Sequence, residues 1–210
     1  MKLDERNQSM HDFFNEKACG YDAVHAELMD TKNALTEAIP TNAKKILDLG
    51  VGTGLELFDL FERIPDAHVT GIDISEKMLE ILATRPFKDQ VAVIVGNFFE
   101  VDFGSDYDVV ISSSALHHFP ADDKKRLYEK IFRCLRTGGS FLNSDCIAST
   151  LGEEHAAFAH YDAHKHEEAH IDTPLAKETE EQLLLEVGFD GITFTNLENP
   201  LYKLCIAQKT

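Results

Sequence analysis

Residues 44–54 read KKILDLGVGTG and are followed by the amphipathic run LELFDLFERI. The apolar residues before Gly50 predict a short strand, and the run after Gly54 has the spacing of a helix. The turn between them carries Gly50, Gly52 and Gly54 at alternate positions. Because glycine adopts left-handed dihedrals and leaves the backbone bare, a ligand can approach this turn closely at the N-terminus of the helix. Strand, glycine turn and helix predict the first half of a nucleotide-binding α/β unit.

The spacing of the glycines indicates which kind of ligand the turn binds. A dinucleotide-binding turn has the pattern G-x-G-x-x-G, whereas here the third glycine comes one residue early and Leu55 occupies its place. With Asp48 in front, the pattern D-x-G-x-G-x-G resembles motif I of the class I S-adenosylmethionine (SAM)-dependent methyltransferases. The resemblance implies a SAM site that includes Asp48, Gly50, Gly52 and Gly54.

A carboxylate follows the second predicted strand, residues 67–72. Asp73 lies roughly 20 positions beyond the glycines, where nucleotide-binding sheets place an acid that accepts hydrogen bonds from the ribose hydroxyls. The alternative role is the N-cap of the next helix, but Ser75 can fill that role, so we favour ribose binding. The segment GIDISEKML also resembles motif II of the methyltransferase family, which implies that Ile74 and Met78 lie against the adenine ring.

Residues 91–96 form an apolar, mostly β-branched run, which predicts a strand buried on both faces. Asn97 and Phe98 follow at its carboxyl end. In the resembling family this position commonly holds an acidic residue that accepts from the adenine amino group. Asn97 departs from that preference, but its amide oxygen can still accept the bond. Phe98 either stacks on the base or belongs to the core.

Residues 107–112 predict the fourth strand, with the sequence SSSALHHF at its carboxyl end. Ligands of such sheets bind outside the carboxyl ends where the strand order reverses, here between the first and fourth strands. We therefore expect Ser113 and Leu116 at the cofactor site. If the methyl acceptor must lose a proton, His117, His118 or a histidine of the lid has a suitable intrinsic pKa, and we name His117 first. The segment resembles the fourth motif of the family and lacks the NPPY-like sequence of its nucleic-acid and glutamine N-methyltransferases.

Residues 8–39 carry apolar side chains at helical spacing, and Pro40 ends the pattern. We expect this segment to cap the sheet. Its portion HDFFNEKACGYD resembles the N-terminal helix that closes over SAM in many class I methyltransferases, where a tyrosine at the place of Tyr21 reaches the methionine end of the cofactor. Tyr21 is either such a contact or an ordinary packed aromatic residue.

Composition limits the partners. A length of 210 residues suits one α/β domain, and the formal charge of −17 would repel a phosphate backbone. We therefore expect a small-molecule substrate, with no nucleic acid and no membrane as partner. The four cysteines are scattered, and the sequence shows neither a signal peptide nor a run of membrane-spanning length. These features predict a cytoplasmic protein.

Residues 151–172 carry five histidines among acidic residues. We expect a helical substrate lid here, because the resembling family inserts its specificity elements after the fifth strand. His160 with His164, and His166 with His170, are spaced four residues apart, so each pair could share a helix face and clamp a metal ion. However, the pairs are offset by six residues, which turns them to different faces. We favour a solvated polar helix and predict no metal site.

Two alternative functions stay open. Tyr161 and Lys165 form Y-x-x-x-K, the catalytic pair of short-chain NAD(P)-dependent oxidoreductases, after a fifth strand that contains Ser144. The glycine turn of that family reads T-G-x-x-x-G-x-G and its fourth strand leads into N-N-A-G, and neither pattern occurs at the corresponding place, so this is the weaker alternative. A SAM-binding sensor without catalysis would have the same cofactor half as an enzyme.

The C-terminal part completes the predicted fold. Residues 122–136 predict a helix ended by glycines at 138–139, and residues 140–146 predict the fifth strand. Residues 191–194 and 201–207 predict two strands whose short connection requires them to be antiparallel. The resemblance implies an α/β fold: a Rossmann-like, seven-stranded, mostly parallel sheet with helices on both faces and an antiparallel last strand.

We expect a single domain with four parts, namely a helical cap (1–40), a SAM-binding core (41–148), a histidine-rich lid (149–175) and a closing helix with strands (176–210). The predicted function is an enzyme that transfers the methyl group of SAM to a small-molecule acceptor, in a site from which water is excluded.

Overall fold

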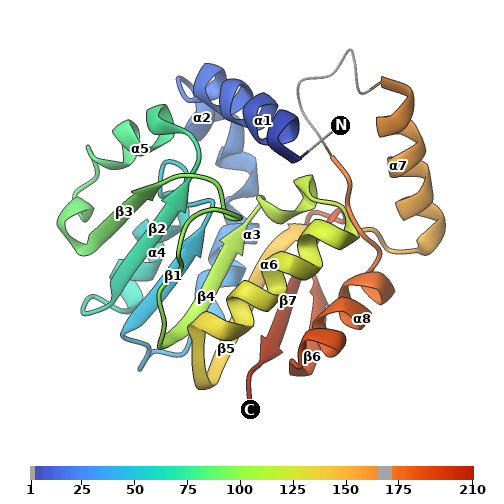
Figure 1. The fold of residues 1–210 in the computed structure, drawn as a ribbon. Coiled ribbons are helices and arrows are strands. Elements are labelled where there is room, and N and C mark those ends of the chain that lie inside the picture. The colour runs from blue at the N-terminus through green and yellow to red at the C-terminus, as the bar shows by residue number, and fades with distance from the viewer. Residues whose placement is uncertain (1–2, 165–171) are drawn as a thin grey trace.

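Seven strands pair into one mixed sheet in the computed structural model of this chain, which describes residues 3–164 and 172–210 (Figure 1). The strands are β1 (Lys45–Leu49), β2 (His68–Asp73), β3 (Val91–Val95), β4 (Tyr107–Ser113), β5 (Leu135–Cys146), β6 (Asp190–Asn196) and β7 (Tyr202–Gln208). Their order across the sheet is β3-β2-β1-β4-β5-β7-β6. Strands β1 to β5 run parallel, and β7 is antiparallel to both of its neighbours. The predicted architecture is confirmed, with the reversal of strand order between β1 and β4.

Helices cover both faces of this sheet. The longer ones are α1 (Leu3–Lys17), α2 (Tyr21–His25), α3 (Met29–Glu37), α4 (Leu55–Arg63), α5 (Glu76–Leu82), α6 (Ala121–Cys134), α7 (Leu151–His164) and α8 (Lys177–Val187), and the short 3-10 turns are η1 (Ala26–Leu28), η2 (Lys88–Gln90) and η3 (Leu116–His118). In Figure 1, α6 and α8 lie in front of the sheet and α3 and α4 behind it. Within the two described ranges, no helix is both long and apolar enough to cross a membrane.

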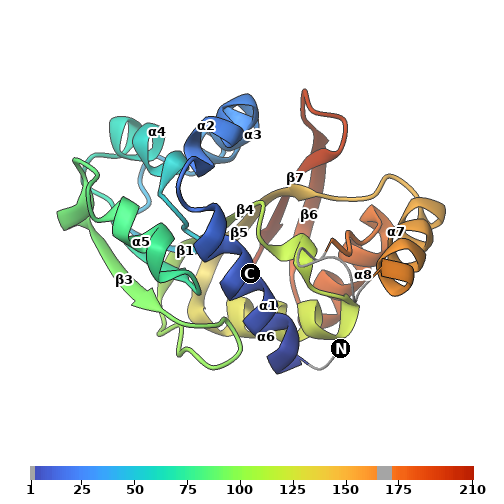
Figure 2. The same ribbon diagram turned by 90° about the horizontal axis from the view of Figure 1, so that it is seen from above.

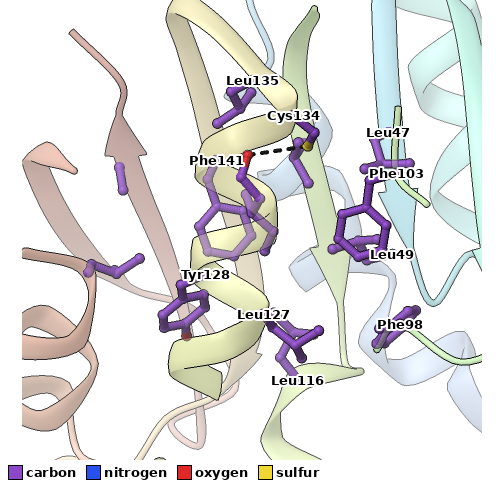
Figure 3. Packing of buried hydrophobic residues seen from close by; sticks show 14 of the residues in the cluster. Leu47, Leu49, Phe98, Phe103, Leu116, Leu127, Tyr128, Cys134, Leu135 and Phe141 are labelled. Carbon is purple, nitrogen blue, oxygen red and sulfur yellow. Dashed lines mark hydrogen bonds between the residues drawn. The ribbon is translucent and has the colours of Figure 1, made fainter. Parts of the chain in front are cut away.

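One large apolar cluster lies on each face of the sheet, because successive residues of a strand point to opposite sides, and a third, small cluster joins Met10 of α1 to Tyr161 of α7. Leu47 and Leu49 of β1 belong to the cluster beneath α6 and α8, whereas Ile46 packs with residues of α3 and α4. Figure 3 shows the first cluster, in which the rings of Tyr128 on α6 and Phe141 on β5 lie with centroids 5.6 Å apart. Packing on both faces holds the central strands firmly, and their carboxyl ends with them.

Strand β3 differs from the sequence prediction. It pairs with β2 alone and forms an edge of the sheet, and Val93 and Val95 are 41% and 53% exposed. The expected burial on both faces was therefore wrong. A run of β-branched residues satisfies the backbone preference of any strand, and it carries no information about how many neighbours that strand has.

Helix α6 also ends earlier than predicted. It stops at Cys134, and Leu135 already has extended dihedrals and begins β5. The ammonium of Lys209 donates to the carbonyl oxygens of Phe132 and Leu135, at 2.6 Å each. A side chain from the C-terminal segment thus satisfies carbonyls at the helix end that the glycines at 138–139 were expected to cap.

The predicted helical cap is present in separate pieces. Helix α1 ends at Lys17, and Gly20, with φ of +98°, precedes α2. Figure 2, seen from above, shows α1 crossing over the central strands. The side-chain oxygen of Asn15 accepts from the hydroxyl of Ser75 at 2.8 Å and from the backbone N–H of Lys77 at 3.1 Å. These bonds fix α1 to the first turn of α5.

Helix α7 forms the first part of the expected lid and lies beside α8 in both views (Figures 1 and 2). The rings of His160 and His164 have centroids 4.4 Å apart, and Nδ1 of His164 lies 2.8 Å from the carbonyl oxygen of His160. This ring therefore interacts with the backbone of its own helix. The second predicted pair, His166 and His170, lies outside the described residues, as does Lys165 of the Y-x-x-x-K pattern.

Candidate functional site

A cavity opens at the carboxyl ends of the central strands, where the strand order reverses. It is lined by Asn7, Met10, Phe14, Tyr21, Gly50, Gly52, Asp73, Ile74, Met78, Gly96, Asn97, Phe98, Ser113, Ser114, Ala115, His118 and Phe119. Nine of the twelve residues predicted for cofactor binding are in this wall, and we call the space the first cavity. The other three, Asp48, Gly54 and Leu116, lie behind the wall, and so does His117.

The glycine turn and Asp73 are joined by a direct hydrogen bond. The backbone N–H of Gly52 donates to Oδ2 of Asp73 at 2.8 Å, and Oδ1 accepts from the backbone N–H of Ser75 at 2.8 Å. Gly50 and Gly52 have φ of +81° and +50°. A Cβ on Gly50 would lie 2.6 Å from the Cβ of Ala115, whereas one on Gly52 would have no neighbour within 3.8 Å. The turn therefore presents bare backbone to the cavity.

Asp73 is a buried carboxyl, 8% exposed. Burial raises its pKa to about 6, although hydrogen bonds from the backbone amides of Ser75 and Gly52 act in the opposite direction. The carboxyl is mainly ionised at pH 7. Ser75, and not Asp73, caps the N-terminus of α5: its hydroxyl accepts from the backbone N–H of Met78 at 3.2 Å.

A buried polar cluster lies behind the glycine turn, on the face of α3 and α4. The carboxyl of Asp48 is fully buried and has no hydrogen-bond partner among the described residues. Burial, followed by the nearby charge of Glu56, raises the pKa of Asp48 well above its usual value. The ammonium of Lys32 donates to Glu56 at 2.9 Å and to the hydroxyl of Ser113 at 3.2 Å. Ser113 thus links this cluster to the cavity wall.

The opposite end of the first cavity is mostly apolar. The ring of Phe98 has its centroid 6.0 Å from that of Phe119, and both rings line the wall and belong to the core cluster. Oδ1 of Asn97 accepts from the backbone amides of Phe99 and Glu100, at 2.8 and 3.2 Å. The atom expected to accept from an adenine amino group is therefore engaged in a local turn.

His117 is held between two carboxylates. Its Nδ1 lies 2.5 Å from Oδ1 of Asp145, and its Nε2 lies 3.1 Å from Oδ1 of Asp172. Oδ2 of Asp145 also accepts from the backbone amides of Leu116 and His117, at 2.9 and 3.0 Å. Burial lowers the pKa of His117, but the two carboxylates outweigh it and raise the pKa to about 9. This ring is anchored on both sides.

A second cavity adjoins the first, and both His117 and His118 line it. It is lined by Phe14, Tyr21, His25, Ser114, His117, His118, Cys146, Asp172, Leu201 and Tyr202. The two cavities share Phe14, Tyr21, Ser114 and His118. The rings of His117 and His118 have centroids 3.9 Å apart. A ligand in the second cavity would therefore approach a ligand in the first near His118.

Sequence analysis missed several residues of these walls. Asn7 and Met10 line the first cavity from α1. The helical cap was predicted, but the residues of it that face the cavity were not. Asp145, which holds His117 from outside both walls, lies near the end of the fifth predicted strand; that position indicates the rim of the site, but a helix-capping or loop role was equally open. Asp172 is the last residue of the histidine-rich stretch 151–172, and no local pattern indicates its place. Tyr161 of the oxidoreductase pattern lies on α7, in neither of the two cavity walls.

Comparison with known proteins agrees with this geometry. A family model described as a methyltransferase domain matches residues 46–139. Malonyl-[acyl-carrier protein] O-methyltransferase of Priestia megaterium (strain DSM 319 / IMG 1521) is 28% identical over 151 residues, which cover 70% of this chain and 54% of that protein. Demethylmenaquinone methyltransferase of Symbiobacterium thermophilum is 30% identical over 152 residues, which cover 66% of this chain and 59% of that protein. The chain thus spans a little over half the length of these curated relatives.

A solved structure shows the same fold. Human N-acetylserotonin methyltransferase in complex with SAM superimposes with a TM-score of 0.72 and 18% identity, covering 93% of this chain and 55% of that chain. The glycine turn, the strand order and the matched domain agree with one another. The chain therefore contains a methyltransferase domain and has the fold of the class I SAM-dependent methyltransferases.

Proposed function

We propose that this protein transfers the methyl group of SAM to a small-molecule acceptor. The observation that carries the proposal is the meeting of two cavities at His118. One is built on the glycine turn and Asp73, and the other is lined by polar, aromatic and aliphatic side chains. Two ligands can thus be held with their reacting atoms close together, which converts an encounter in solution into a reaction within one complex.

The residues of the first cavity fit SAM. When bound, SAM supplies a methyl group on a positively charged sulfur. The bare backbone at Gly52, where a side chain would project into the space, lets the cofactor lie against the turn. The ionised carboxyl of Asp73 accepts hydrogen bonds from the ribose hydroxyls.

The remaining predicted contacts divide into three groups. Ile74, Met78, Asn97 and Phe98 enclose the adenine end, while Tyr21, Gly50 and Ser113 lie at the methionine end. Asp48, Gly54 and Leu116 act from behind the wall as positioning residues. The surroundings of Gly54 agree with a positioning role. Gly54 precedes α4 with φ of +73°, and a Cβ there would meet the side chain of Leu82 at 3.3 Å.

The acceptor occupies the second cavity, with His118 at the boundary. His118 is only 3% exposed, and it packs edge-on against Phe14 of the α1 cap at a centroid distance of 5.7 Å. The cap thereby keeps water from the place where the methyl group is transferred. His118 is nearer the cofactor cavity than His117, which lines the second cavity alone. We therefore assign contact with the acceptor, and removal of its proton, to His118, with His117 fixed beside it.

The negative charge of the protein favours a small-molecule acceptor over nucleic acid or an anionic membrane. The formal charge of −17 opposes binding to nucleic acid or to an anionic membrane. The named acceptors of two relatives, malonyl-[acyl-carrier protein] and demethylmenaquinone, provide the first compounds for a trial. All four cysteines are free, which agrees with a reaction in the reducing cytoplasm.

The test is methyl transfer from labelled SAM to a panel of small hydroxyl, thiol, amine and carboxyl acceptors. We expect one chemical class to gain label, with formation of the demethylated cofactor in equal amount. We expect His118→Ala to lose turnover while it keeps affinity for SAM, measured by calorimetry. Tight SAM binding without transfer to any acceptor would favour the non-catalytic sensor, and no SAM binding would contradict the proposal.

A further inference from the structure

Two imidazoles and one carboxylate converge at the wall of the second cavity. Nε2 of His117 lies 3.1 Å from Oδ1 of Asp172, and Nδ1 of His118 lies 3.4 Å from the same oxygen. One ligand atom from each of the three side chains falls within 4.8 Å of the others. We infer that His117, His118 and Asp172 bind a divalent transition-metal ion, at a place distinct from the predicted histidine pairs of the lid.

The distances fit a metal centre without large movements. Zinc lies about 2.0 Å from imidazole nitrogen and carboxylate oxygen, so two ligands of a tetrahedral ion stand about 3.3 Å apart. The two measured separations, 3.1 and 3.4 Å, bracket that value. The third separation, between the two imidazole nitrogens, is within 4.8 Å. Rotations of the imidazole rings and of the side chain of Asp172, which is 54% exposed, would bring the three atoms around an ion.

The surroundings of His117 match those of a metal ligand. A metal-bound histidine ordinarily donates its other ring N–H to a carboxylate, which fixes the tautomer and the orientation of the ring. Asp145 does this from the side opposite Asp172, at 2.5 Å from Nδ1, and it is itself held by two backbone amides. Asp145 thus holds Nδ1 of His117 and leaves Nε2 on the side of Asp172, which lines the second cavity with it.

The ligand set selects the kind of ion. Two imidazoles with one carboxylate suit Zn²⁺ or Fe²⁺, whereas Mg²⁺ and Ca²⁺ prefer oxygen ligands throughout. Three protein ligands leave at least one coordination position, and that position faces the second cavity. The catalytic use of the ion rests on the proposed function: the ion would hold an acceptor oxygen or sulfur beside the first cavity and assist the loss of its proton to water, so that His118 would act on the acceptor through the ion that it holds. Binding of the ion does not depend on that function.

The test is a titration of tag-free, chelator-treated protein with Zn²⁺ alone, followed by calorimetry. We expect one tight site in the wild type. Asp172→Asn keeps the shape of the side chain and removes the charged ligand, and we expect it to weaken binding at least about tenfold, as does His118→Gln. Co²⁺ as a second probe should give the visible absorption of a nitrogen- and oxygen-ligated ion in the wild type and lose it in Asp172→Asn. Thermal melts establish that the variants fold.

His160→Gln is the matched control, because it removes the histidine pair of α7 and leaves the second cavity intact. Zn²⁺ affinity should persist in it. The inference is overturned if the wild type has no tight site, or if His160→Gln abolishes the site while Asp172→Asn retains it; the three side chains are then plain ion pairs. SAM affinity, measured on the same samples, reports separately on the proposed function, because Asp172 does not line the first cavity.

Discussion

The backbone N–H of Gly52 donates a hydrogen bond of 2.8 Å to the carboxyl of Asp73, so the middle of the glycine turn and the end of β2 are one unit. We expect Asp73→Asn to keep the bond from Gly52, because its amide oxygen can accept it, to lose the bond from the backbone N–H of Ser75, and to weaken SAM binding. A hydrogen bond to a charged group contributes about 1.5–3 kcal/mol, so the Kd for SAM should rise roughly tenfold to a hundredfold. Calorimetry measures it. Asp66→Asn, at an exposed acid, is the control and should leave the Kd unchanged.

The pKa of Asp73 predicts how SAM affinity depends on pH. Burial raises this pKa to about 6, so the carboxyl takes up a proton as the pH falls from 7 to 5. Only the ionised form accepts from both ribose hydroxyls, so SAM affinity should be constant above pH 7 and should fall below pH 6, by at most about tenfold per pH unit. The slope should disappear in Asp73→Asn. An equal slope in both proteins would show that another group titrates.

Gly50 is the glycine of the turn for which a side chain is most costly. Its φ is +81°, and an added Cβ would lie 2.6 Å from the Cβ of Ala115 on the opposite wall. Gly50→Ala should therefore lower the melting temperature and reduce SAM affinity together, with about 1–2 kcal/mol of the loss coming from the left-handed dihedrals. Gly152→Ala is the matched control: it lies in α7, its Cβ would meet nothing within 3.6 Å, and helix propensity favours alanine. Similar melting temperatures for the two variants would contradict this account.

Local chemistry explains why part of the site could be predicted from sequence. The turn at Gly50 and Gly52 needs glycine wherever it occurs, and Asp73 follows a strand at a fixed distance, so both can be recognised without a structure. The antiparallel pairing of β6 with β7 also followed from local pattern, since their short connection leaves no room for a helical crossover.

Contacts between distant segments explain what sequence analysis missed. Asp145 reaches His117 across 28 positions, and Lys209 reaches the end of α6 across 77. Such pairs depend on the order of strands in the sheet and on side-chain directions, and no spacing in the chain records them. The exposed edge of β3 was missed for a related reason, because the number of neighbours of a strand is a property of the whole sheet.

Lys124 and Lys125 are neighbours on α6, but the first side chain is buried and the second is exposed. Their alanine variants should therefore differ in unfolding free energy. Lys124 pairs with Glu180 of α8, which also accepts from the hydroxyl of Tyr128, and all three side chains are buried. Lys124→Ala leaves the carboxylate without its counter-charge in the interior, which should cost about 3–5 kcal/mol of unfolding free energy in a urea titration. Lys125 pairs with Glu186 at the surface, where water screens the charges, so Lys125→Ala should leave the unfolding midpoint nearly unchanged. Equal shifts in the two variants would mean that the pair between α6 and α8 does not hold these helices together.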